Sequence, residues 1–196
     1  EWRGGRPPRI CMVSFYFHPE YSGSSIQALN LSTALRQHGC ESFIVSANLS
    51  GSPEHELFQG IPVHRRPVLR ARDAQIPSFW LSLAWFLVRR RHEYDLIHAH
   101  GTLQHTIAGL IGRLVGKPSI LKVAMADSDL AFERQGRLWG TINSLLVARF
   151  SQFIATTEAI QHEFERRRLD TGRVSLIPNA VDTSRFAPVS PAERAL

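Results

Sequence analysis

Ionisable residues in this sequence gather in short segments that each follow a run of apolar residues. His98 and His100 end one such run, and their spacing puts both side chains on one face of a strand. Lys122 lies inside another apolar run, and Asp127 and Asp129 come after it. Burying an unpaired charge is costly, so a lysine in a buried strand needs either a partner of opposite charge or a position at the end of the strand, near solvent. These residues predict either a site for a sugar or phosphate or an internal salt bridge.

Residues 18–25 (HPEYSGSS) form a third polar segment. Gly23 and Ser24 stand where a helix is predicted to begin, and a helix N-terminus favours an anion. The spacing is neither G-x-G-x-x-G nor a P-loop, so nicotinamide-type binding is not supported. A turn glycine beside a capping serine explains the same residues without a ligand, and both interpretations stay open.

A metal site is the alternative for the histidine pair. His98 and His100 would need further ligands, for which His105, Asp127 and Asp129 are candidates, but no second pair or H-E-x-x-H supports it. Either histidine could instead be structural. We therefore predict no metal site.

Composition narrows the class of protein. Of 196 residues, 43% are hydrophobic and 20% are charged, which predicts a packed domain, and the formal charge of +6 favours anionic partners. No basic stripe with interleaved aromatics appears, so nucleic acid is disfavoured. Cys11 and Cys40 form no framework and are predicted to be buried thiols, which suits a cytoplasmic location.

The hydrophobic periodicity alternates between strand and helix. Strands are predicted at residues 9–17, 43–47, 61–66, 95–99, 119–125, 153–156 and 174–177, and helices at 24–38, 76–91, 103–115, 137–150 and 158–168. Residues 49–60 read as a loop. Seven strands, several of them fully apolar and separated by helices, predict an α/β fold, a Rossmann-like doubly wound parallel sheet.

Two of the helices carry specific expectations. Ser24 and Gln27 fit a capping box that would begin the first helix, and Gly39 would follow its end. The segment 76–91 is too short to span a membrane, and it is so apolar that both faces should be covered. Its arginine-rich end also suggests a peripheral contact with an anionic membrane.

Ligands of doubly wound sheets bind beyond the carboxyl ends of the strands. The loops at that edge are residues 18–24, 98–102, 124–129, 156–158 and 178–182. Besides the residues already named, they bring His18, Glu20, Tyr21, Thr157 and Asn179 to the predicted site.

Several segments together resemble glycosyltransferase family 4. They are residues 18–47, DLIHAHG (95–101), GKPSILKVAMADSDL (116–130), FIATTEAIQHEF (153–164) and VSLIPNAVDTSRFAP (174–188). The last is close to the family's V-x-x-I-P-N-G-V-D-x-x-x-F-x-P signature, and all five follow the family's order. The resemblance covers residues 9–188.

The resemblance implies a GT-B enzyme, in which two Rossmann-like domains face each other across a cleft. Its N-terminal half holds the acceptor and its C-terminal half binds a nucleotide sugar; transfer is typically retaining, without a protein-held metal. By resemblance, Gly23 and Ser24 would lie against the donor phosphates, His100 would line the cleft as the best candidate for catalysis, and Asn179 would lie near the interdomain crossing.

The sequence also departs from the family pattern. Gly23–Ser24 replaces a paired glycine, and Asn179–Ala180 replaces Asn-Gly. Residues 123–125 lack the histidine that many members carry there. A subgroup with K-hydrophobic-A at that point is closer to this sequence, which draws attention to Lys122 and Asp127. The Glu-x7-Glu motif of the donor half is not in this sequence.

We therefore predict a flexible segment at residues 1–8, an acceptor-side domain at 9–188 and the start of an interdomain linker at 189–196. The expected function is that of a hexosyltransferase's N-terminal domain, inactive alone, with no cofactor beyond the nucleotide-sugar co-substrate. The acceptor would be a glycan or lipid-linked, as in polysaccharide synthesis, and the location cytoplasmic or on the inner membrane face. The alternatives are a non-catalytic sugar- or nucleotide-binding module and a metal-dependent hydrolase that uses the histidine pair.

Overall fold

The computed structural model describes residues 5–71, 73–101, 104–125, 129–132 and 136–181. The strands are β1 (Ile10–Val13), β2 (Ser42–Ala47), β3 (His55–Phe58), β4 (Ile61–Arg66), β5 (Leu96–His100), β6 (Ser119–Val123), β7 (Gln152–Ala155) and β8 (Val174–Leu176). The helices are α1 (Gly23–Gln37), α2 (Gln75–Arg89), α3 (Ile107–Leu114), α5 (Arg137–Val147), α6 (Glu158–Arg166) and the 3₁₀ turn η2 (Thr171–Arg173). The predicted linker at residues 189–196 lies outside the described residues.

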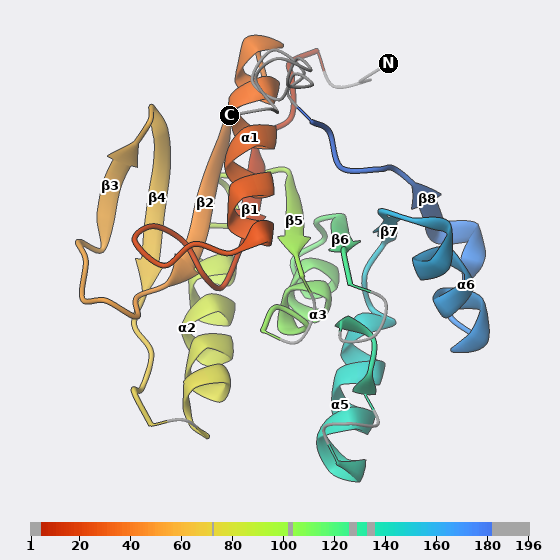
Figure 1. Cartoon of the computed structure of the whole chain (residues 1–196). Coiled ribbons are helices and arrows are strands. Elements are labelled where there is room, and N and C mark those ends of the chain that lie inside the picture. Colours follow the sequence, from red (N-terminus) through yellow and green to blue (C-terminus); the bar gives the residue numbers. More distant parts are fainter. Residues whose placement is uncertain (1–4, 72, 102–103, 126–128, 133–135, 182–196) are drawn as a thin grey trace, which may run out of the picture.

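The described strands form one sheet in the order β3-β4-β2-β1-β5-β6-β7-β8, and every pairing except β3 with β4 is parallel (Figure 1). The order reverses direction between β1 and β5, which makes a doubly wound sheet. The predicted fold class is confirmed.

The antiparallel strand β3 corrects the prediction of a loop at residues 49–60. β3 and β4 form a hairpin whose turn residues, Gln59 and Gly60, both have positive φ, as tight hairpin turns require. The sequence does not predict this strand, because it has only four residues and lies at the edge of the sheet. None of its side chains is fully buried, so its sequence shows no clear hydrophobic pattern.

The two faces of the sheet are covered unequally. Alternate residues of β1 point to opposite sides: Ile10 and Met12 pack with Leu29 of α1, whereas Cys11 and Val13 belong to the larger core beneath α2, α3, α5 and α6. In Figure 1, α1 crosses in front of β1 and β2. Cys11 is buried and Cys40 is half-buried, so the prediction of a buried thiol holds only for Cys11; both are free.

The start of α1 differs from the predicted capping box. Ser22, not Ser24, is the N-cap: its hydroxyl accepts from the Ser25 backbone N–H at 3.2 Å, and the Ser25 hydroxyl accepts from the Ser22 backbone N–H at 2.9 Å. A serine three residues later replaces the glutamine that the pattern suggested. At the other end, Gly39 follows the C-cap with φ of 76°, as predicted.

Helix α2 is also exposed more than predicted. Its inner face is buried through Phe79, Leu83, Phe86 and Leu87, but Leu81 is 76% exposed and Trp85 57% exposed. The expectation that both faces would be covered is therefore wrong for the described residues, because α2 is covered on the side that faces the sheet, α3 and Trp139 of α5, while Leu81 and Trp85 lie on the other side.

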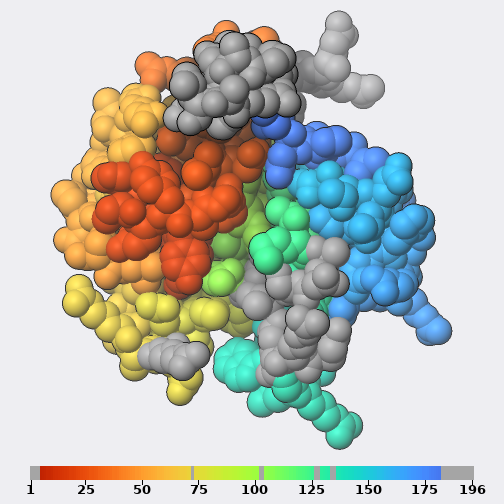
Figure 2. Space-filling model, in the orientation of Figure 1, coloured from red at the N-terminus to blue at the C-terminus, as the bar shows by residue number. Residues whose placement is uncertain are grey.

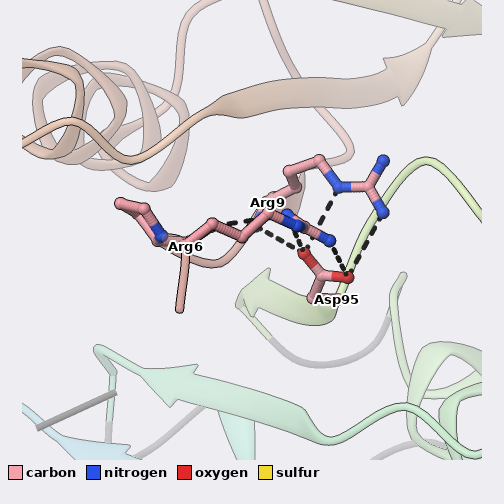
Figure 3. Close-up of polar contacts among 4 residues, drawn as sticks. Arg6, Arg9 and Asp95 are labelled. Carbon is pink, nitrogen blue, oxygen red and sulfur yellow. Dashed lines mark hydrogen bonds and ion pairs between the residues drawn. The ribbon is translucent and has the colours of Figure 1, made fainter. Parts of the chain in front are cut away.

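Asp95, the aspartate of the DLIHAHG segment, ties the amino ends of β1 and β5 together. Its carboxylate accepts from the Arg9 backbone N–H at 2.9 Å and from the Arg9 and Arg6 guanidinium groups (Figure 3). These bonds hold the pKa of Asp95 well below its ordinary value. Asp95 thus has a structural role, and Arg6, within the segment predicted to be flexible, is one of its partners.

Candidate functional site

A pocket of about 370 Å³ lies at the carboxyl ends of β1, β5 and β6. This is the edge at which doubly wound sheets bind ligands, beside the point where the strand order reverses. In Figure 2 the orange-red surface of residues around the start of α1 and the green surface after β6 lie on opposite sides of a hollow. The lining residues are Phe15, Tyr16, Ser22, Gly23, Ser24, Gln27, His100, Gly101, Gln104, His105, Lys122, Ala124, Met125, Asp129 and Asn179.

The N-terminus of α1 forms one wall of the pocket. Gly23 and Ser24 are its first two residues, and the N–H groups at the first positions of a helix have no intrahelical acceptor. No side chain crowds Gly23, since an added Cβ would meet no atom within 4 Å among the described residues. Together with the helix dipole, this wall suits a phosphate or another anion.

His98 and His100 lie on one face of β5, as their spacing predicted. Their ring centroids are 4.3 Å apart, and the planes are inclined by 31°. Only His100 lines the pocket; His98 lies behind it, and both are buried. Burial lowers the pKa of His98 to about 4 and that of His100 well below its ordinary value, so both rings are neutral at pH 7.

The buried ring nitrogens of His100 are the most telling feature of the site. Neither Nδ1 nor Nε2 has a hydrogen-bond partner in the described part of the chain, nor does Nε2 of His98 or of His105. Buried polar groups are normally satisfied, because an unmade hydrogen bond costs about 1–3 kcal/mol. A polar ligand in the pocket would supply the missing partner.

Lys122 contributes a positive charge to the same pocket. It pairs with His100 in the register of β5 and β6, and no carboxylate forms an ion pair with it among the residues described. Burial lowers its pKa below the ordinary value. The predicted alternative of an internal salt bridge is not seen with the described carboxylates, Asp129 included, and Asp127 lies outside the described residues.

Asp129 closes the loop after β6 and lines the pocket. Its Oδ2 accepts hydrogen bonds from the backbone N–H groups of Ala124 and Met125, both at 3.0 Å. That geometry gives Asp129 a part in holding the loop. Asp127, the other predicted carboxylate, lies outside the described residues.

Four predicted residues lie away from the pocket. The ring of His18 stacks on Phe58 of β3 at 4.6 Å and contacts Tyr21, while Glu20 belongs to the same outward loop. Thr157 caps α6 by accepting from the Ile160 backbone N–H at 3.3 Å. Asn179, in contrast, lines the pocket as predicted.

Sequence reasoning overlooked several lining residues and undervalued His105. Gln27 lies one helical turn beyond Gly23, and Gln104 and His105 follow β5. His105 is bonded through Nδ1 to the Gly101 carbonyl at 3.2 Å, and burial lowers its pKa to about 4. The helical spacing from Gly23 could have revealed Gln27; nothing in the sequence distinguished Gln104 from an ordinary surface residue.

A second hollow, of about 500 Å³, lies at the opposite edge of the sheet. Arg9, Arg36 and Arg90 line it, but they are engaged by Asp95, the Gly60 carbonyl and Glu93 respectively. Because its cations already have partners and it adjoins the amino ends of the strands, we do not assign it as the site.

The histidine pair was also considered as a metal site. In the part of the chain that the structure describes, no three His, Cys, Asp or Glu side chains gather closely enough to hold a metal ion. Two histidines whose rings lie against each other at a 31° tilt do not make a coordination shell by themselves. The described geometry thus gives the metal-dependent hydrolase no support.

The sheet order, the free helix N-terminus and the polar pocket at the switch point define a Rossmann-like domain. HepE of Anabaena, solved with UDP-glucose, has a similar fold: the TM-score is 0.69 at 19% identity, covering 94% of this chain and 47% of that one. Sucrose-phosphate synthase of Thermosynechococcus elongatus matches with a TM-score of 0.68 at 18% identity, covering 96% and 52%. MurG of Acinetobacter baumannii matches with a TM-score of 0.59 at 15% identity, covering 90% and 46%.

The family follows from the sequence model. The model described as Glycosyltransferase Family 4 matches residues 21–185, so the chain belongs to that family, and the resemblance seen in its motifs is confirmed. No curated protein matches the chain. The chain spans about half the length of the solved structures named above.

The helices were also compared with the length that a bilayer requires. None of those in the described residues is both long and apolar enough to cross a membrane.

Proposed function

We propose that this chain is the acceptor-side half of a retaining glycosyltransferase that moves a hexosyl group from a nucleotide sugar to a glycan or lipid-linked acceptor. The observation that carries the proposal is the pocket where the α1 N-terminus, Lys122 and the unsatisfied nitrogens of His100 meet. Membership of glycosyltransferase family 4 supports it. So does HepE, whose similar fold was solved with UDP-glucose.

Each wall of the pocket has a proposed role. The N–H groups of Gly23 and Ser24 would face the diphosphate of the donor, where the helix dipole stabilises negative charge. Lys122 would add a cation near the departing diphosphate, where charge develops during transfer. The neutral ring of His100 would hydrogen-bond a hydroxyl of the sugar or acceptor, and the nucleotide sugar would serve as co-substrate without a further cofactor.

The second half of the site is proposed to come from a donor-binding domain. The solved structures with similar folds are about twice as long as this chain, and the matched part of each is one half. A cleft between two domains would exclude water and hold both substrates in reacting geometry. We propose that the protein works in the cytoplasm, on the inner face of a membrane if the acceptor is lipid-linked.

The test uses the full natural protein and its turnover of nucleotide sugars. Release of nucleoside diphosphate would be followed with UDP-glucose first and then with a panel of UDP-, GDP- and ADP-sugars. His100→Ala should lower kcat/KM by about tenfold or more, which corresponds to about 1.4 kcal/mol of transition-state stabilisation. His162→Ala is the matched control, since His162 is exposed on α6, away from the pocket.

The outcomes separate the proposed function from its alternative. NMR of the product should show the anomeric configuration of the donor; inversion would contradict the retaining mechanism. Saturable binding of a nucleotide sugar with no turnover, even with acceptors present, would instead identify a non-catalytic binding module. Equal activity of His100→Ala and His162→Ala would remove His100 from the site.

A further inference from the structure

The outer face of α2 carries an exposed apolar stripe. Leu81, Trp85 and Val88 are spaced four and three residues apart, so they lie on one side of the helix. They are 76%, 57% and 42% exposed. The stripe is separate from the pocket of the candidate site, none of whose lining residues belongs to α2.

Two arginines extend the stripe at the end of α2. The Arg89 guanidinium lies over the Trp85 ring, 5.5 Å from its centroid, and the Arg91 guanidinium donates to the Val88 carbonyl at 3.2 Å. Neither forms an ion pair with a carboxylate in the described part of the chain. Their charges therefore remain available to an external anion.

A shallow groove joins the apolar and the cationic parts. Its volume is about 520 Å³, and it is lined by Ala84, Trp85, Val88, Arg89 and Arg91. Apolar side chains and two guanidinium groups thus share one surface depression. That combination fits the boundary between the acyl chains and the headgroups of a lipid.

The helices next to α2 also lack acidic residues and expose apolar side chains. Helices α2, α3 and α5 contain no Asp or Glu at all, whereas α6, on the same side of the sheet, contains three glutamates. Trp139 of α5 meets Trp80 of α2 with ring centroids 6.1 Å apart, and Leu138 beside it is 70% exposed. The set of helices without carboxylates thus extends from α2 through α3 to α5, and Figure 1 shows α2 and α5 on either side of α3.

We propose that the α2 face, defined as Leu81, Trp85, Val88, Arg89 and Arg91, docks the protein on a bilayer that contains anionic phospholipid. The arginines match the charge of such headgroups, and tryptophan favours the interface between water and hydrocarbon. Docking itself is independent of the proposed function. The consequence of docking, that the enzyme would meet a lipid-linked acceptor at the membrane, rests on the proposed glycosyltransferase function.

Topology relates the docked face to the site. α2 follows β4 and precedes β5, so its first turn lies near the carboxyl edge of the sheet, where the pocket is. The docking residues belong to the middle and end of α2, which run toward the amino edge of the sheet, where Arg90 lines the second hollow.

The experiment measures vesicle flotation of the full chain without any sugar nucleotide. Vesicles of phosphatidylcholine containing about 30% phosphatidylglycerol should bind the protein, vesicles of phosphatidylcholine alone should bind it weakly, and salt should weaken the interaction. The variant R89E/R91E should lose about 30-fold or more in partitioning. L81S/W85S should also bind less, and its residual binding should be the more sensitive to salt.

The matched control is R36E/R168E, which changes net charge equally but alters exposed arginines on α1 and after α6. R36E/R168E should bind the vesicles at least about ten times more tightly than R89E/R91E. The reason is that arginines close to the headgroups attract them more strongly than arginines that only add to the net charge of the protein. Circular dichroism would show that all variants fold.

Three results would overturn the proposal: binding independent of phosphatidylglycerol, equal binding by R89E/R91E and R36E/R168E, or no binding at low salt. If L81S/W85S instead converts a dimer to a monomer in light scattering while vesicle binding stays unchanged, the α2 face is an interface between copies. None of these results bears on diphosphate release, which is measured separately, so the two proposals fail independently.

Discussion

Three buried histidines near the pocket are held in the neutral form, and each keeps a ring nitrogen that could bind a ligand. His98, His100 and His105 are all buried, and each has a ring nitrogen without a partner in the described residues. Desolvation keeps them neutral, and the charge of Lys122 acts in the same direction on His98 and His100. A neutral ring can both donate and accept a hydrogen bond, which suits a sugar hydroxyl.

This arrangement predicts how stability depends on pH. Because the folded-state pKa of His98 is near 4 while an unfolded histidine titrates near 6.5, the unfolded chain binds more protons between these values. The free energy of unfolding should therefore fall as pH decreases from about 6.5 to 4, by up to about 1.4 kcal/mol per pH unit for each such histidine. Urea titrations across this range measure the slope.

His98→Gln isolates one contribution to that slope. The variant cannot titrate, so its free energy of unfolding should depend less steeply on pH between 6.5 and 4, whatever its stability at pH 7. His162→Gln, at an exposed position, should leave the slope unchanged. A slope for His98→Gln equal to that of the wild type would show that His98 is not held neutral by burial.

At the scale of elements, the beginning of α1 determines the geometry of the anion-binding wall. Ser22 precedes the helix and exchanges hydrogen bonds with Ser25, so the N–H groups of Gly23 and Ser24 are left to the pocket. The cap thus holds the first turn in place without using the groups that a ligand would need.

Ser22→Ala should destabilise the protein by about 1 kcal/mol, the usual cost of losing an N-cap. Ser24→Ala, which loses only a contact with the Ser22 hydroxyl at 2.8 Å, should cost less than half as much. Urea denaturation of both variants measures the difference. A larger loss for Ser24→Ala would favour the capping box predicted from sequence over the one observed.

The packing of α3 on the core depends on a small residue. An added Cβ at Gly109 would lie 2.6 Å from the buried Phe150 ring, closer than atoms can approach. Alanine gains up to about 1 kcal/mol in helix propensity, but overpacking costs about 1–3 kcal/mol. We therefore expect Gly109→Ala to lower thermal stability.

Gly23→Ala is the control for this prediction, because it is also a helical glycine but has no atom within 4 Å of an added Cβ among the described residues. It should change the melting temperature little. If Gly109→Ala raises the melting temperature, the close contact with Phe150 is not maintained in solution.

At the scale of the whole molecule, the two sides of the sheet differ in chemistry. α1 alone covers one face among the described helices, next to the pocket, whereas α2, α3 and α5 on the other face carry arginines and no carboxylate. In our proposals, the side next to the pocket meets the donor and the acceptor, and the α2 face on the other side docks on an anionic membrane.

The sequence by itself determined the fold class, most of the elements and the edge of the sheet that carries the site. Apolar runs alternating with helical periodicity leave few ways to bury both, and the doubly wound sheet is the solution that parallel strands allow. The spacing of His98 and His100 placed them on one face because side chains alternate along a strand. Polar residues after each strand then indicated the site directly.

Only the tertiary structure decided which of those polar residues meet. The outward course of the first loop, stacked on β3, carries His18 and Tyr21 away from the pocket, while a turn of helix brings Gln27 in. Whether an apolar helix is covered likewise depends on its neighbours, so α2 could not be known to expose Leu81 and Trp85. Local patterns specify direction within one element, but contact between elements depends on packing across the whole chain.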